Sequence, residues 1–258
     1  MDLSIIIPVK NEAGNIVPLV AEIVAALGDL ADYEIVYVDD GSEDATAAEI
    51  RRLQGSIPRL VLVRHAASCG QSAAIRTGVR TARGSWIATL DGDGQNDPAD
   101  IPGLWQIAAA APALPPLLVA GHRARRQDSW SKRHASLVAN AVRRRLLHDA
   151  TPDTGCGLKL FPRALYLDLP YFDHMHRFLP ALALRAGAIV RSVPVNHRPR
   201  QRGTSKYGVL DRLFVGIVDL AGVMWLRRRN SRPVIVAESE TAAPTHKTAA
   251  GAPADPVP

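Results

Sequence analysis

Short continuous runs of aliphatic residues alternate with segments of helical length along most of the chain. Runs typical of strands cover 3–9, 33–39, 59–65, 85–91, 116–122 and 189–195. Helical patterns lie between the early runs, at 14–27, 43–54, 71–82 and 98–111. Continuous Ile, Val and Leu runs indicate strands that are buried on both faces. Their alternation with helices predicts an α/β fold, with a mostly parallel sheet flanked by helices.

The later part of the chain carries further helical patterns among basic loops. Helices are expected at about 130–147, at 162–168 and at 176–186. The segment 123–145 has eight Lys or Arg residues against one acidic residue, Asp128. Such a segment is typical of a solvated helix face, and it also suits the attraction of phosphates and anionic head groups.

A last helix is predicted over 208–226 and is followed directly by three arginines at 227–229. On a helical wheel, Asp211, Arg212 and Asp219 fall within one sector of about 100°, and the rest of the helix is apolar. The segment is too short and too charged for a membrane span. Two interpretations stay open: an amphipathic helix lying in a membrane interface, or a helix packed on the core.

The expected domain organisation has three parts. Residues 1–208 form the α/β domain, and 209–229 form the amphipathic helix. Residues 230–258 are rich in Ala, Pro, Thr and Glu and have little apolar mass to bury, so this tail is expected to be disordered.

Composition narrows the class of partner. The 258 residues carry a formal net charge of +6, which suits phosphates, nucleic acid or anionic lipid without choosing among them. The two cysteines, Cys69 and Cys156, make no disulfide scaffold, and no Cys/His spacing resembles a zinc site. The beginning of the chain lacks the features of a signal peptide, so a cytoplasmic protein is expected.

Polar and acidic clusters follow three of the predicted strands. They are "PVKNE" at 8–12, "VDDGS" at 38–42 and "DGDGQ" at 91–95. Ligands bind at the carboxyl ends of strands in open α/β sheets, so the three clusters should converge on one edge. Taken singly, Asn11 and Ser42 are typical helix caps, with Glu43 and Asp44 in a first turn. The coincidence with a third acidic cluster favours a functional site.

The stretch "ATLDGDGQNDP" at 88–98 gathers carboxylates that need a positive partner. The chain has no G-x-G-x-x-G dinucleotide motif and no P-loop. The turn is not an EF-hand, since the sixth position from Asp91 is Asn96 and the twelfth is Pro102. Asp-x-Asp beside basic residues is instead typical of a Mg²⁺ or Mn²⁺ site that holds a nucleotide diphosphate.

The motifs as a set resemble the family-2 glycosyltransferases of GT-A fold, most closely the dolichyl- or polyprenyl-phosphate sugar transferases. The resemblance extends over roughly residues 1–226. It rests on seven stretches in order, at 4–16, 33–46, 70–84, 88–102, 153–161, 176–188 and 197–208.

The resemblance implies roles for individual residues. The nucleotide-sugar donor would contact Pro8, Val9, Glu12, Asp39, Asp40, Gln71, Asp91 and Asp93. The metal would be held by Asp91, Asp93 and Gln95. Catalysis would depend on Asp91, Asp93, Arg202 and Lys206, and the acceptor phosphate would be bound by Arg126, Arg133, Ser205 and His176.

The implied activity is metal-dependent transfer of a hexose, expected to be mannose, from a GDP- or UDP-sugar to polyprenyl or dolichyl phosphate. A phosphate acceptor is already anionic near neutral pH, so no strong general base is needed. Direct in-line attack would invert the anomeric centre. The protein is expected at the cytoplasmic face of an anionic membrane, without nucleic acid as a partner.

Two other functions remain open from the sequence. A saccharide acceptor would need a general base for its hydroxyl. Asp153 is the obvious candidate in the later half of the α/β domain, where the acceptor is expected to bind (the acceptor half). A non-catalytic binder of nucleic acid or anionic membranes would use only the basic segments. The aromatic content of 5% and the lack of a groove-reading motif count against that binder.

Overall fold

A seven-stranded mixed sheet forms the centre of the molecule in the computed structural model, which describes residues 1–28, 30–123, 143–199 and 209–231. The strand order is β3-β2-β1-β4-β6-β5-β7. The strands are β1 Leu3–Val9, β2 Tyr33–Asp39, β3 Leu60–Arg64, β4 Trp86–Thr89, β5 Leu117–Arg123, β6 Lys159–Pro162 and β7 Ile189–Val195. The predicted α/β class and mostly parallel sheet are confirmed.

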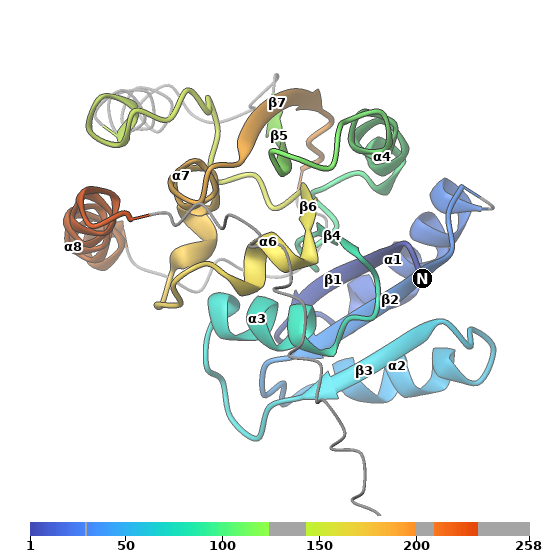
Figure 1. Cartoon of the computed structure of the whole chain (residues 1–258). Helices are drawn as coiled ribbons and strands as arrows, with labels where there is room; N and C mark the ends of the chain where they lie inside the picture. The colour runs from blue at the N-terminus through green and yellow to red at the C-terminus, as the bar shows by residue number, and fades with distance from the viewer. Residues whose placement is uncertain (29, 124–142, 200–208, 232–258) are drawn as a thin grey trace, which may run out of the picture.

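Helices cover both faces of this sheet (Figure 1). They are α1 Ala13–Leu27, α2 Thr46–Gln54, α3 Gln71–Thr81, α4 Ile101–Ala109, α6 Arg163–Leu167, α7 Leu179–Arg185 and α8 Val209–Arg228, with 3-10 turns η1 Pro98–Asp100 and η2 Met175–Arg177. Of the helix predicted at about 130–147, residues 143–147 are described and are helical, and the remainder lies outside the described residues.

The alternation of side chains along β1 explains why two cores form. Ile5 and Ile7 pack in a cluster with α1, α2 and α4, while Ile6 packs in a second cluster with α3, α6, α7 and α8. All three isoleucines are fully buried. Burial of such a side chain contributes about 1.5–3 kcal/mol, so a central strand with two apolar faces stabilises both layers.

Parallel pairing brings the ends of β1, β2 and β4 to one edge of the sheet. β1 pairs in parallel with β2 on one side and with β4 on the other. Among the described strands, β6 alone runs antiparallel to its neighbours, β4 and β5. The sequence analysis did not predict β6, because its short apolar run gives little periodic signal.

Helix α8 has one face on the core and another exposed. Val223 is fully buried, and Leu220, Met224 and Leu226 pack partly against the second core cluster. The Arg185 side chain donates to the Leu226 carbonyl at 2.8 Å and to the Arg229 carbonyl at 3.1 Å, which caps the end of the helix. No helix that the structure describes has both the length and the apolar character to cross a bilayer.

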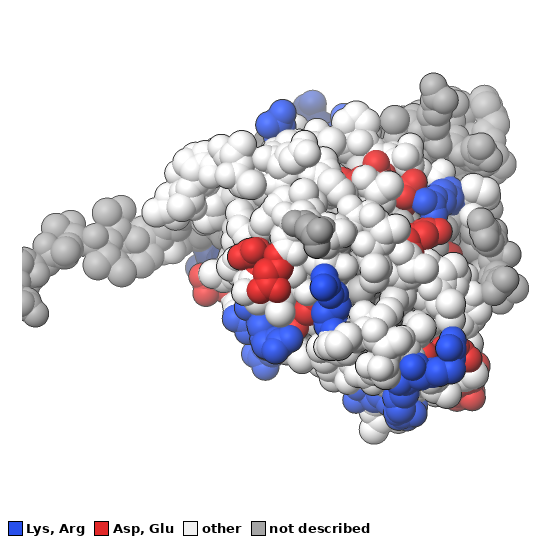
Figure 2. All heavy atoms as spheres, turned by 90° about the vertical axis from the view of Figure 1, so that its right-hand side faces the viewer, with Lys and Arg blue, Asp and Glu red and all other residues white. Residues whose placement is uncertain are grey.

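Charged side chains are mixed in sign on the face shown in Figure 2. Acidic and basic groups lie next to each other there in small clusters. The net positive charge of the chain therefore forms no continuous basic surface over the described residues of this face. The predicted tail at 230–258 lies outside the described residues from 232 onward.

Candidate active site

The three polar clusters meet at one edge of the sheet, as their positions after parallel strands predict. Val9 pairs with Asp39 in the β1–β2 register, and the Asp40 amide donates to the Val9 carbonyl. The Leu90 amide donates to the Ile6 carbonyl on the other side of β1. Asp91 follows directly, so Pro8, Asp39 and Asp91 belong to neighbouring strand ends.

The loops after β1 and β2 are joined by reciprocal hydrogen bonds. The Asn11 amide donates to Ser42 Oγ at 2.9 Å, and the Glu43 amide donates to Asn11 Oδ1 at 2.8 Å. The Glu12 amide donates to Thr46 Oγ1 at 2.9 Å. Asn11 and Ser42 thus bind each other's loop, and the interpretation of either as a simple cap of its own helix is wrong. Helix α2 accordingly begins at Thr46, later than the predicted start at 43.

Asp39 is fully buried and both of its carboxylate oxygens are engaged. Arg64 Nε donates to Oδ2 at 2.7 Å, and the Ser42 amide donates to Oδ1 at 2.8 Å. This arrangement orients Asp39 at the end of β2, beside the half-exposed guanidinium of Arg64.

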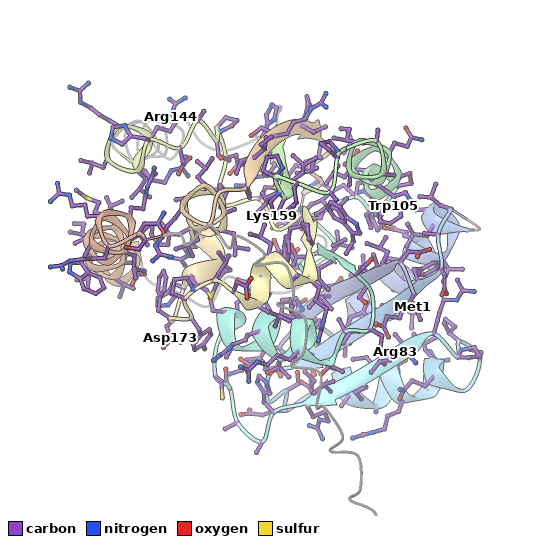
Figure 3. The ribbon with its side chains drawn as sticks, viewed as in Figure 1. Met1, Arg83, Trp105, Arg144, Lys159 and Asp173 are labelled. Carbon is purple, nitrogen blue, oxygen red and sulfur yellow. The ribbon has the colours of Figure 1, made fainter. Side chains whose placement is uncertain are left out.

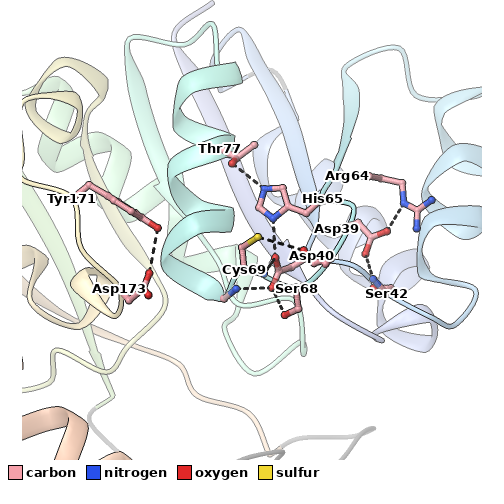
Figure 4. A network of polar contacts seen from close by, with 12 residues as sticks. Asp39, Asp40, Ser42, Arg64, His65, Ser68, Cys69, Thr77, Tyr171 and Asp173 are labelled. Carbon is pink, nitrogen blue, oxygen red and sulfur yellow. Dashed lines mark hydrogen bonds and ion pairs between the residues drawn. The ribbon is translucent and has the colours of Figure 1, made fainter.

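Asp40 points into the loop that precedes α3 (Figure 4). Its carboxylate contacts His65 Nδ1 at 2.8 Å, Ser68 Oγ at 2.7 Å, the Cys69 amide at 2.8 Å and the Gly70 amide at 2.9 Å. Burial raises the pKa of Asp40, but these hydrogen bonds outweigh it and hold the pKa below its ordinary value. The contacts of Asp40 are therefore to the protein's own loop, which leads into Gln71.

The Asp91 carboxylate packs closely against Gly157. A Cβ on Gly157 would lie 2.3–2.6 Å from the Asp91 carboxylate. Gln71 Nε2 donates to Asp91 Oδ1 at 2.9 Å, and the Asp91 amide donates to Asn96 Oδ1 at 3.1 Å. These contacts fix the carboxylate at the turn after β4.

The electrostatics of Asp91 favour a bound cation. Burial, and next the charge of Asp93, raise the pKa of Asp91 to about 6. Two neighbouring carboxylates offer the hard oxygen ligands that Mg²⁺ and Mn²⁺ prefer, and a divalent ion would relieve their repulsion. The residues present therefore fit a Mg²⁺ or Mn²⁺ ion held by Asp91 and Asp93.

Gln95 contacts the chain that leaves β7. The Arg198 amide donates to the Gln95 carbonyl at 3.0 Å, and Gln95 Nε2 donates to the Arg198 carbonyl at 3.4 Å. The Arg198 guanidinium pairs with Asp97 at 2.6 Å and with Glu22 at 2.7 Å. The acidic turn thus anchors the start of the basic loop. Three residues predicted to act in that loop lie outside the described residues: Arg202 and Lys206, expected in catalysis, and Ser205, expected to bind the acceptor phosphate.

His176 reaches the first turn of α3 from the acceptor half. Its Nδ1 lies 2.7 Å from Ser72 Oγ, one residue after Gln71. Burial lowers the pKa of His176 to about 3, with further contributions from Lys159, Arg177 and His174. The imidazole is therefore neutral at physiological pH. The other predicted acceptor residues, Arg126 and Arg133, lie outside the described residues.

The sequence analysis missed two cations at the centre of the site. Arg123 forms a two-point ion pair with Asp153, with Nε to Oδ2 at 2.6 Å and Nη2 to Oδ1 at 2.9 Å. Lys159 is buried in the interior (Figure 3) and donates to the carbonyls of Thr154 and Cys156. Both cations act to lower the pKa of Asp91. The position of Arg123 at the end of a predicted strand was the available signal.

The family model described as "Glycosyl transferase family 2" matches residues 4–169. The chain belongs to glycosyl transferase family 2. The match includes β1 through β6, and therefore both Asp39 and the Asp91–Asp93 pair.

Two relatives show how far the similarity of this family 2 transferase extends. It is 36% identical over 241 residues to dodecaprenyl-phosphate galacturonate synthase of Rhizobium johnstonii, covering 90% of this chain and 69% of the relative. It is 35% identical to undecaprenyl-phosphate 4-deoxy-4-formamido-L-arabinose transferase of Edwardsiella ictaluri, covering 81% of this chain and 63% of the relative. The chain thus spans about two thirds of the length of these relatives.

Solved structures confirm the GT-A fold of the family 2 transferase. Glucosyl-3-phosphoglycerate synthase of Mycobacterium tuberculosis, in complex with Mg²⁺ and UDP, has a TM-score of 0.62 at 17% identity, covering 90% of this chain and 80% of that one. A mannosyltransferase of Pyrobaculum calidifontis, in complex with GDP-Man and Mn²⁺, has a TM-score of 0.59 at 21% identity, covering 89% and 65%. At these identities the likeness concerns the fold.

Proposed function

We propose that this glycosyltransferase moves a sugar from a nucleotide diphosphate to a polyprenyl phosphate, with a divalent metal and with inversion at the anomeric carbon. The observation that carries the proposal is the Asp91–Asp93 pair at the carboxyl edge of the sheet. The acceptor class is supported by the two relatives, whose names specify dodecaprenyl and undecaprenyl phosphate.

The donor diphosphate would lie against the acidic turn after β4. A bound Mg²⁺ or Mn²⁺ supplies charge stabilisation for the leaving diphosphate. Gln71 holds one oxygen of Asp91 through its 2.9 Å hydrogen bond, so the other oxygen can face the ligand. Pro8, Val9, Glu12 and Asp39 at the neighbouring strand ends are proposed to contact the nucleoside.

A phosphate acceptor agrees with the state of the carboxylates on the acceptor side. Asp153, the candidate general base for a saccharide hydroxyl, has both oxygens bonded to Arg123. A base in a two-point ion pair is a poor proton acceptor, because protonation would break the pair. An anionic phosphate needs no such base, and its direct attack opposite the leaving group inverts the sugar.

The sugar and the base of the donor remain predictions. Mannose was expected from the resemblance, whereas the names of the two relatives specify galacturonate and 4-deoxy-4-formamido-L-arabinose. The donor panel in any assay therefore has to include GDP-mannose, UDP-hexoses and UDP-uronic acids.

We also propose that α8 contacts the anionic membrane surface that holds the polyprenyl phosphate acceptor. Ile217, Val218 and Trp225 are 57%, 59% and 60% exposed and fall within one sector of about 100° on the helical wheel. Arg228 and Arg229 are exposed at the end of the helix. An apolar stripe with a basic end suits the interface of an anionic bilayer.

A transfer assay tests the proposal. Purified protein, Mn²⁺ and the labelled donor panel are incubated with undecaprenyl phosphate, and lipid-linked sugar is extracted and counted. We expect product with one donor class, and none when a chelator removes the metal. Transfer to free saccharides but not to the lipid phosphate, or no product with any donor, would contradict the proposal.

A further inference from the structure

A second cluster of metal-ligand side chains lies outside the Asp91–Asp93 pair. Asp40, His65 and Cys69 each offer one ligand atom, and these three atoms lie within 4.8 Å of one another. They come from the residue after β2, the residue after β3 and the loop before α3. We propose that this cluster is a binding site for a zinc-class divalent ion, separate from the site of the nucleotide diphosphate.

The ligand types select the metal. One carboxylate, one imidazole and one thiolate form a set of oxygen, nitrogen and sulfur donors, which suits Zn²⁺. Mg²⁺ prefers all-oxygen coordination, so it would favour the Asp91–Asp93 pair. The two sites therefore discriminate between the two kinds of ion by their chemistry.

The Asp40–His65 pair needs little movement to admit the ion. His65 Nδ1 and Asp40 Oδ1 are 2.8 Å apart and already face each other. Two ligands of one tetrahedral Zn²⁺ at about 2.0–2.1 Å from the metal are separated by roughly 3.3 Å, so the pair has to open by only about half an ångström. The Cys69 thiol is exposed and donates a long hydrogen bond of 3.4 Å to the Ala67 carbonyl, which it would exchange for the metal, and solvent can supply the fourth ligand.

The outer contacts of a metal site are present as well. His65 Nε2 lies 2.9 Å from Thr77 Oγ1 (Figure 4). An imidazole that binds metal through Nδ1 carries its proton on Nε2, and this N–H can donate a hydrogen bond to the Thr77 hydroxyl. Asp40 Oδ2 accepts from Ser68 Oγ and the Gly70 amide, which orient the carboxylate. On binding, the Cys69 thiol loses its proton to solvent, and the imidazole proton moves from Nδ1 to Nε2.

Spacing along the sequence does not indicate this site, because His65 and Cys69 match no common zinc motif and Asp40 is 25 residues before His65. The parallel pairing of β2 with β3 brings the ligands together. The loop they occupy leads directly into Gln71, which contacts Asp91.

Zinc binding by the whole chain tests the proposal without any assay of transfer. Metal-free protein is titrated with Zn²⁺ against a chromogenic chelator, and separately with Co²⁺ as a spectroscopic substitute. We expect one ion whose affinity falls more than about a hundredfold in Cys69→Ala. Thr77→Val should weaken binding about 10- to 100-fold, which is the usual cost of losing an outer partner.

Matched variants separate this site from others. Asp91→Asn and Cys156→Ala should keep the affinity of the wild type, and the Co²⁺ form of the wild type should show a thiolate charge-transfer band that Cys69→Ala lacks. Cys69 is exposed, so its replacement should not disturb folding. Equal Zn²⁺ affinity in wild type and Cys69→Ala, or no Zn²⁺ uptake at all, would overturn the proposal.

Discussion

At the scale of residues, the site is defined by which charged groups are compensated and which are not. Asp39 and Asp153 each face an arginine, and Asp40 is surrounded by hydrogen-bond donors. Asp91 has a raised pKa, because the charge of Asp93 adds to its burial. Lys159, Arg123 and Gln71 compensate the charge of Asp91 only in part, so this carboxylate is costly in the metal-free protein and is the group that a metal would relieve.

Asp91→Asn should therefore stabilise the metal-free protein near pH 7.5. Because the folded pKa is raised, ionisation of Asp91 destabilises the fold as the pH rises from about 4 through about 6. We expect a gain of about 1–2 kcal/mol in the free energy of unfolding, allowing for partial exposure. Urea titrations measure it, and the difference should shrink as the pH is lowered to 4. A loss of stability at pH 7.5 would contradict the pKa assignment.

Gly157→Ala should weaken metal binding while leaving the fold intact. The added Cβ would lie within 2.6 Å of the Asp91 carboxylate and would displace it. A displacement of about 1 Å can cost about a hundredfold in an ordered site, so we expect Mn²⁺ affinity to fall at least tenfold. Gly155→Ala is the matched control, since its Cβ would approach Arg123 Nη2 at 3.2 Å and Asp153 Oδ1 at 3.5 Å but no atom of Asp91 within 4 Å. Equal affinities in the two variants would refute this role of Gly157.

At the scale of elements, long aliphatic runs were sufficient to predict six of the seven strands, with ends within two residues of those observed. Strand β6 was missed because its four residues, Lys159–Pro162, are too few to give a periodic signature. The start of α2 was misplaced because Ser42 bonds the amide of Asn11, a contact across 31 residues that no local pattern encodes.

Helix α8 gives the prediction at this scale. Trp225→Glu should reduce binding to vesicles that contain anionic lipid at least tenfold, because it places a charge in the exposed apolar stripe. The free energy of unfolding should stay within about 0.5 kcal/mol of the wild type, as is usual for an exposed position. Leu114→Glu, at a 78% exposed position away from α8, is the control. Cosedimentation with the vesicles measures binding by the two variants. An equal loss of binding in Trp225→Glu and Leu114→Glu would exclude α8 as the membrane contact.

At the scale of the whole molecule, the sheet edge that carries the site was predictable because parallel strands must end together. The positions of the cations that complete the site, Arg123 and Lys159, were not predictable. Arg123 and Asp153 are 30 residues apart in sequence, and Lys159 reaches the interior only because β6 pairs between β4 and β5. Such contacts depend on how distant segments pair in the sheet, so the sequence alone does not reveal them. The motif after each strand is local, so it can be recognised in the sequence.

The most direct test of the central claim is calorimetric titration of nucleoside diphosphates into the protein with and without Mn²⁺. If Asp91 and Asp93 hold the ion that binds the diphosphate, UDP or GDP should bind the wild type with Mn²⁺ at least tenfold more tightly than without it. The Asp91→Ala/Asp93→Ala variant should show no such gain. Equal nucleotide affinity with and without Mn²⁺ in the wild type, or a full gain in the variant, would contradict the account.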